Sequence, residues 1–165
     1  MPRAATPRFR VEPEFETTYP GASRLATECV LNTGYIADRF GAYVEALVRR
    51  RGIPSMAAFN ALEVVRGAGE PLPPSVIAER MVLSRGTMTS ILDSLERRGL
   101  IRRVRHERDR RMRRVIVTDE GARRALAVLP ELHAAEQRWL ACLTPNQQRM
   151  LLRLVAILEA HLPAR

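Results

Sequence analysis

The stretch "SVIAERMVLSRGTMTSILDSLERRGLIRR", Ser75 to Arg103, decides the fold. It predicts two short helices, one from Ser75 to Met81 and one that opens after Ser84. Serine is a preferred N-cap residue, and apolar residues recur at helical spacing after it. Only Val82 and Leu83 lie between the two helices, so the connection must be a tight turn. This order predicts a helix-turn-helix.

The second of these helices has two different faces. Met88, Ile91, Leu92 and Leu95 share one side of the 3.6-residue period, and Gly99 supplies a stop signal just past the helix end. The rest of the circumference is small and rich in hydrogen-bonding groups. Its members are Arg85, Thr87, Thr89, Ser90 and Asp93.

A basic hairpin is predicted directly after this helix. "LIRRV" and "RRVIVT" are typical of two strands, and "RHERDRRM" between them is a long, exposed loop. Eight arginines and only Glu107 and Asp109 lie between Arg102 and Arg114, so this segment supplies a net +6 of the chain's +9. Such a concentration favours a polyanionic partner, with nucleic acid the commonest and an acidic membrane surface the alternative.

The remaining helices are predicted from caps and apolar periods. The segment 1–22 mixes Pro, Arg, Glu and Thr without a period, which indicates an extended or poorly ordered arm. A long helix with one apolar stripe follows over about 23–51, and a shorter one begins after Ser55. Thr118 caps a helix that should kink at Pro130 without ending there, and "TPNQ" at Thr144 fits a capping box for the last helix.

These elements predict a mainly α fold with a small β-hairpin wing, in which a winged helix-turn-helix over about 55–118 is flanked by long helices over about 23–51 and 119–162. At 165 residues, residues 23–165 suit a single domain. With 46% hydrophobic but only 5% aromatic residues, the core should consist mainly of aliphatic side chains, which argues against an all-β fold.

At this point "SVIAERMVLSRGTMTSILDSLERRGLIRR", followed by "DRR" and "VIVTDEG", resembles the multiple-antibiotic-resistance regulator (MarR) family of bacterial transcription factors. The resemblance covers about Ser23 to Leu162. It implies a homodimer held by the first and the last two long helices, a recognition helix in the major groove and a wing tip in the minor groove. The chain departs from the family pattern at Ser90, where Arg is frequent, and at Arg113, where apolar residues are frequent.

The resemblance also implies roles for individual residues. Asp109 is similar to the residue that stabilises the wing by pairing with an Arg. A small aromatic or phenolic effector would bind between the dimer helices and the winged module, and Tyr35, Phe40, Phe59 and His133 are its candidate contacts. The DNA-binding positions that the resemblance implies are Ser84, Arg85, Gly86, Thr87, Thr89, Ser90, Arg110 and Arg111. The local positive charge adds Arg108 and Arg113 to the candidate DNA-binding residues.

We therefore expect a cytoplasmic, sequence-specific regulator that binds double-stranded DNA as a homodimer, acts as a ligand-responsive repressor and recognises an inverted repeat. The apolar stripe of the first helix is more simply a dimer seam than an internal core. Alternatives are a sequence-neutral architectural nucleic-acid binder, a thiol-based redox regulator that uses Cys29, and an enzyme.

An enzyme is disfavoured because the sequence shows no nucleophile and base of the catalytic kind. The three histidines, which include His106 and His161, are too scattered for a metal site, and we expect neither a metal nor a cofactor. Cys29 and Cys142 are too few for a disulfide framework, and the sequence contains no apolar run of membrane-spanning length.

Overall fold

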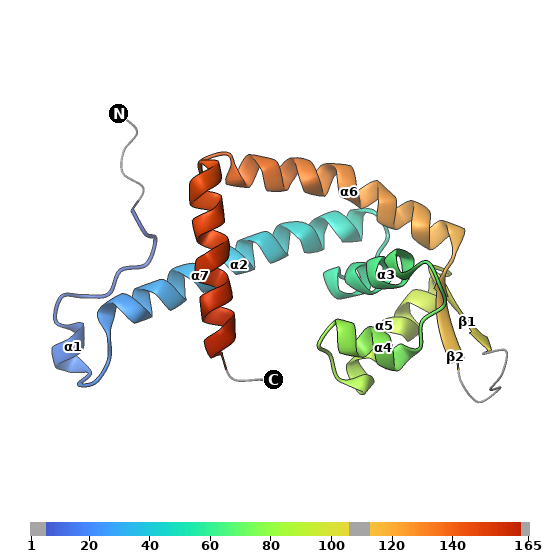
Figure 1. Ribbon diagram of the computed structural model, residues 1–165, viewed down its shortest axis with the longest axis horizontal. Coiled ribbons are helices and arrows are strands. Elements are labelled where there is room, and N and C mark those ends of the chain that lie inside the picture. Colours follow the sequence, from blue (N-terminus) through green and yellow to red (C-terminus); the bar gives the residue numbers. More distant parts are fainter. Residues whose placement is uncertain (1–5, 106–112, 163–165) are drawn as a thin grey trace.

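The computed structural model describes residues 6–105 and 113–162, and it is mainly helical, as predicted (Figure 1). Its strands pair in one antiparallel hairpin. In chain order the elements are α1 (Phe15–Thr18), α2 (Arg24–Arg50), α3 (Met56–Ala68), α4 (Pro74–Arg80), α5 (Arg85–Arg97), β1 (Ile101–Arg105), β2 (Arg113–Val117), α6 (Asp119–Leu140) and α7 (Pro145–His161).

The predicted helix caps are present. A hydroxyl group accepts a backbone N–H bond at the start of five helices, and at α7 the side chain of Gln147 completes the capping box with Thr144. Helix α4 begins one residue earlier than expected, at Pro74. Proline suits the first position of a helix, because the N–H that it lacks would have no partner within the helix there. Helix α6 continues through Pro130, as predicted. The predicted caps are Ser55, Ser84, Thr118 and Thr144, and the structure adds Ser23 as the cap of α2.

The hairpin is slightly offset from its prediction and has an additional partner. Strand β1 begins at Ile101, one residue later than expected, and Ile101 pairs with Val117. Leu72, in the turn before α4, exchanges two backbone hydrogen bonds with Val115, at 3.0 and 2.8 Å. The segment around Leu72 therefore forms a backbone bridge to β2 in addition to the predicted pairing of two strands, and this bridge connects the wing to the helix-turn-helix.

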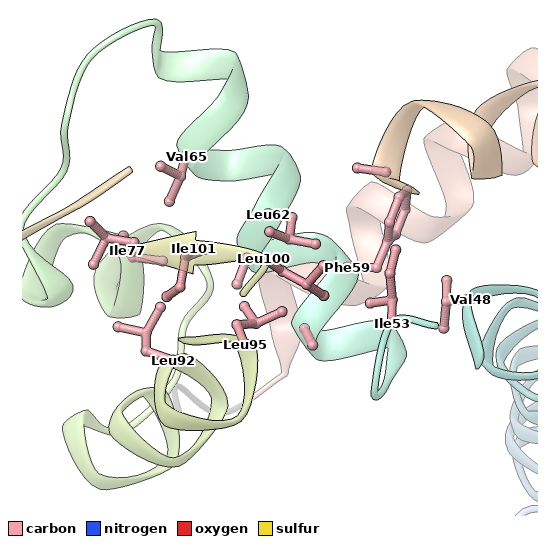
Figure 2. Close-up of a cluster of buried hydrophobic side chains, with 14 of the residues drawn as sticks. Val48, Ile53, Phe59, Leu62, Val65, Ile77, Leu92, Leu95, Leu100 and Ile101 are labelled. Atoms are coloured by element: carbon pink, nitrogen blue, oxygen red, sulfur yellow. The ribbon is translucent and has the colours of Figure 1, made fainter. Parts of the chain in front are cut away.

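One aliphatic core holds the winged module together. Leu62 of α3, Ile77 of α4, Leu92 of α5 and Leu100 before β1 are each at most 1% exposed, and Figure 2 shows these side chains converging from separate elements. The end of α2 and the first half of α6 contribute Val48 and further residues to the same cluster. The core thus fixes α5 and the hairpin relative to the long helices.

Gly121 marks the closest approach within this arrangement. A Cβ atom at this position would lie 2.0 Å from the carbonyl oxygen of Leu100. Thr118, just before α6, donates its hydroxyl to the carbonyl of Gly99 at 2.7 Å. The first turn of α6 is therefore pressed against the chain between α5 and β1, which sets the angle at which α6 leaves the winged module.

The long helices remain largely uncovered in the single chain. Helix α7 contains no buried residue, and α2 buries only Leu47 and Val48 near its C-terminal end. Many large apolar side chains on these two helices are consequently exposed. They include Leu25, Val30, Leu31, Ile36 and Phe40 on α2, and Met150, Leu151, Leu152, Leu154, Val155, Ile157 and Leu158 on α7.

Residues 6–22 follow α2 as an extended arm with one helical turn, α1. Asn32 binds both backbone groups of Phe9, accepting from its N–H at 3.0 Å and donating to its carbonyl at 2.9 Å. Glu28 accepts the N–H of Val11 at 3.1 Å. The sequence, which lacks a period here, suggested an extended or poorly ordered arm, and these side-chain contacts from α2 supply an order that periodicity cannot show.

Candidate nucleic-acid interface

The turn between α4 and α5 presents the N-terminal end of α5 to solvent. Ser84 caps α5 by accepting the N–H of Thr87 at 3.2 Å, and the two hydroxyls lie 2.8 Å apart. Val82 in the turn has a φ of 53°, a left-handed conformation that a β-branched residue rarely adopts, and its side chain is 70% exposed. The tight turn is therefore maintained at the cost of backbone strain.

Helix α5 exposes the polar face expected from its sequence. Met88, Leu92 and Leu95 are buried against the core, which turns the opposite side of the helix outward. The predicted DNA-binding positions of this segment are all exposed: Ser84, Arg85, Gly86, Thr87, Thr89 and Ser90.

The hydroxyl groups on this face donate to the helix backbone itself. Thr89 donates to the carbonyl of Arg85 at 2.9 Å, and Ser90 donates to the carbonyl of Gly86 at 3.2 Å. A hydroxyl that donates in this way retains acceptor capacity toward solvent. In this conformation Thr89 and Ser90 can accept hydrogen bonds from a partner, such as the amino groups at base edges.

Arg85 is the strongest donor on this face. Within residues 6–105 and 113–162, no hydrogen bond or ion pair holds its guanidinium group. Arginine presents five N–H donors in a planar fork, and two of them match the O6 and N7 acceptors of guanine. The first turn of α5 therefore carries an uncommitted group of the kind that reads bases in the major groove.

Sequence reasoning missed the ion-pair group that connects α5 to the hairpin. Arg103 of β1 reaches Asp93 at 2.6 Å and Glu96 at 2.7 Å, and its backbone N–H donates to Glu96 at 3.0 Å. Only 22% of the Arg103 side chain is exposed. Side chains alternate along a strand, so Arg103 lies on the opposite face of β1 from Arg102. This alternation was the only signal in the sequence that could have distinguished the two arginines.

This ion-pair group changes how the basic charge is divided. Arg103 is committed to two carboxylates, and Arg114 lies against the turn before α4, where it donates to the carbonyl of Pro71 at 3.4 Å. Arg102 and Arg113 remain exposed. Part of the arginine run is thus structural, and only part of it can face a polyanion.

Four predicted wing residues lie outside the described part of the chain. Arg108, Asp109, Arg110 and Arg111 belong to the segment 106–112, and their roles stay predictions. Arg113, the last of the predicted DNA-binding residues, opens β2 opposite Arg105 and is exposed.

The four candidate effector contacts do not form one cluster within a single chain. Phe59 is 5% exposed and belongs to the core of the winged module. Phe40 stacks on Trp139, with ring centroids 4.8 Å apart, and Tyr43 contacts the same ring edge-on. The sequence did not single out Trp139 as an aromatic partner because α2 and α6 are far apart in the chain.

Tyr35 and His133 have different surroundings. Tyr35 lies under the arm, where the ring of Phe9 meets it edge-on at 5.4 Å and Arg8 lies over its ring. A hydrogen bond from Arg39, reinforced by the charges of Arg39 and Arg8, lowers the pKa of the Tyr35 hydroxyl. His133 is exposed on α6.

The remaining groups to consider are the two cysteines and the potential metal ligands. Cys29 and Cys142 are both free thiols with exposed side chains. No group of three or more potential metal ligands occurs in residues 6–105 and 113–162. In the same residues no helix is long and apolar enough to cross a membrane.

Comparisons with known proteins agree on one family. A family model described as "MarR family" matches residues 51–112, which include α3, α4, α5 and β1. The chain is 33% identical over 110 residues to the HTH-type transcriptional regulator PecS of Dickeya dadantii (strain 3937), covering 66% of each protein. It is 28% identical over 125 residues to the HTH-type transcriptional repressor YetL of Bacillus subtilis (strain 168), covering 75% of this chain and 74% of YetL.

A solved structure supports the fold over most of the chain. The organohalide-sensing RdhR transcriptional regulator, in its ligand-free form, superposes with a TM-score of 0.77. The alignment covers 93% of this chain and 88% of that chain at 18% identity. At this level of identity the likeness establishes the shared architecture of winged module and long helices.

Proposed function

Because the chain belongs to the MarR family of winged-helix transcriptional regulators, we propose that it binds double-stranded DNA sequence-specifically as a homodimer and represses transcription. Its relatives are transcriptional regulators, and YetL is named a repressor. The observation that carries the proposal is the exposed face of α5, on which Arg85 has no partner within the described residues, beside a hairpin rich in arginine.

In this proposal α5 enters the major groove with its N-terminal end foremost. Arg85 donates to a guanine, while the outward lone pairs of Thr89 and Ser90 accept from base amino groups. Arg108, Arg110, Arg111 and Arg113 contact phosphates or a narrowed minor groove, and Asp109 stabilises the wing. Gly86 lets the helix approach the duplex closely, because it has no side chain.

Exposed apolar surface supports the homodimer. Large exposed apolar patches are uncommon on monomeric proteins and mark interaction surfaces. Leu25 and Val30 on α2 are each 71% exposed, and Leu152 on α7 is 69% exposed. A second copy that packs against α2, α6 and α7 would bury them and would arrange two α5 helices around a two-fold axis.

Two-fold symmetry determines the form of the DNA site. We expect an inverted repeat whose half-sites are centred about 34–36 Å apart, one turn of B-DNA. A small aromatic or phenolic effector would bind near Phe40, where the stacked Trp139 offers an aromatic wall. Such an effector would release DNA only by binding more tightly to a dimer with a different α5 spacing.

Selection of bound duplexes from a random pool tests the proposal. Enrichment of an inverted repeat supports it, and an unenriched pool supports the architectural alternative. The salt dependence of affinity gives a second measure: about eight phosphate contacts per dimer predict a log–log slope of roughly −7. A slope near zero would contradict the proposed role of the wing arginines.

A further inference from the structure

The N-terminal arm carries two carboxylates that have no side-chain partner among residues 6–105 and 113–162. Between Val11 and Tyr19 the arm contains three glutamates and no basic residue. Glu16 accepts the N–H of Arg24 at 2.9 Å. Glu12 and Glu14 are exposed, and no side-chain contact joins either carboxylate to another residue that the structure describes.

A group of four arginines lies at the opposite end of α2. This arginine patch surrounds an open hollow of about 400 Å³ where the end of α2 meets the first turns of α6. Glu131 binds two of the four guanidinium groups, at 2.7 and 3.3 Å, and Glu120 binds the other two. The arginine patch consists of Arg50, Arg51, Arg123 and Arg124.

The arginine patch has spare capacity for anions. Four guanidinium groups share two carboxylates, which leaves an excess of two positive charges. The side chains of Arg123 and Arg50 are 71% and 56% exposed, and each guanidinium has five N–H donors, more than the one carboxylate it contacts can accept. The two unpaired carboxylates of the arm match this excess in number and are opposite in sign.

Within one chain the arm cannot reach the arginine patch. The 27 residues of α2 make a rod of about 40 Å, with the arm at its N-terminal end and the patch at its C-terminal end. Figure 1 shows α1 and the winged module at opposite ends of α2. The two charged groups can therefore meet only between different copies of the chain.

A two-fold dimer brings these ends together. If the axis is perpendicular to α2, the two copies of this helix run antiparallel, so the N-terminal end of one lies toward the C-terminal end of the other. The exposed apolar side chains of α2, from Leu25 to Phe40, lie along the helix between the two charged groups.

We propose that in the homodimer the arm of each protomer docks on the arginine patch of its partner, with Glu12 and Glu14 as the docking carboxylates. This inference rests on the homodimer proposed above. By symmetry the contact occurs twice in each dimer, and Asn32 and Glu28 hold the arm in the extended path that the contact requires.

Charge reversal tests the docking. In the Glu12→Arg/Glu14→Arg variant we expect the dimer dissociation constant to rise about ten- to a hundredfold at low salt, because four exposed ion pairs per dimer become repulsive. Adding Arg50→Glu and Arg51→Glu to the same chain should restore much of the loss. The control is Glu70→Arg/Glu79→Arg, which makes the same charge change on the winged module and should leave dimerisation unchanged.

A disulfide cross-link supplies evidence that does not depend on the stability of these variants. With Cys29→Ser and Cys142→Ser as background, Glu14→Cys/Arg51→Cys should form a covalent dimer under mild oxidation, and neither single-cysteine variant should do so.

The outcomes separate the two proposals. If the wild-type chain is a monomer in sedimentation experiments, the homodimer itself is refuted. If the wild type is a dimer whose dissociation constant is indifferent to the arm reversal, or if the paired cysteines do not cross-link, the arm does not dock on the partner and the homodimer stands.

Discussion

Replacing Gly121 by alanine should place a methyl group against the backbone. Its Cβ would lie 2.0 Å from the carbonyl oxygen of Leu100, 2.9 Å from that carbonyl carbon and 2.9 Å from Cγ1 of Val117. The obstacle is mainly a backbone carbonyl, which cannot move aside by changing rotamer. The first turn of α6 must therefore shift away from the start of β1.

The expected cost follows from overpacking. Extra methyl groups forced into packed sites destabilise proteins by about 1–3 kcal/mol, and we expect the upper part of that range because the α6 backbone itself must move. For a chain of this size, each kcal/mol lowers the melting temperature by about 2–4 °C. The variant should thus melt about 4–12 °C below the wild type.

Gly67→Ala is the matched control for this experiment. Gly67 lies inside α3, and a Cβ there would meet no heavy atom within 4 Å. The same substitution should stabilise α3 by at most about 0.5–1 kcal/mol, because alanine is the better helix former and Gly67 is the second-last residue of the helix. Thermal unfolding at one fixed protein concentration measures both variants. Equal melting temperatures for wild type and Gly121→Ala would refute the close approach of α6 to β1.

Three further substitutions test the interface and the fold. Arg103→Ala should lower DNA affinity several-fold for all sequences alike while circular dichroism stays unchanged, because the hairpin loses its ion pairs with α5; a loss at one base position only would contradict this role. Arg85→Ala should cost about 1–3 kcal/mol at a single base pair of the half-site, and a uniform loss in a mutated-operator titration would contradict base reading. The N–H of Met56 and the guanidinium of Arg49 lower the pKa of Glu45, so Glu45 contributes stability above the ordinary glutamate pKa of about 4.3 that is lost as the pH falls through its lower folded value. In the Glu45→Gln variant the denaturation midpoint should therefore depend less on pH below that value. A pH profile identical to that of the wild type would argue against the contact.

The sequence predicted those parts of the fold that depend on local signals. Hydroxyl caps and apolar periods involve residues within one or two helical turns, so the starts of α3, α5, α6 and α7 were predicted to the residue from Ser55, Ser84, Thr118 and Thr144. The outward face of α5 followed from the same periodicity, since burial of Met88 and Leu92 determines which side faces solvent.

Contacts between distant segments could not be predicted in this way. The pairing of Leu72 with Val115 joins residues 43 positions apart, and Leu72 lies between two prolines in a turn whose sequence gave no strand pattern. The division of the arginine run into committed and exposed residues depends on where Arg103 meets Asp93. The sequence named Phe59 as a candidate effector contact but did not show that Phe59 is buried in the core of the winged module.

The ratio of two dissociation constants tests most directly the proposal that this chain is a sequence-specific DNA-binding regulator. The two duplexes are the selected inverted repeat and a scrambled sequence of the same length and composition, titrated at the same physiological salt concentration. We predict that the inverted repeat binds at least about a thousandfold more tightly. Equal affinity for the two duplexes would contradict sequence-specific recognition by α5.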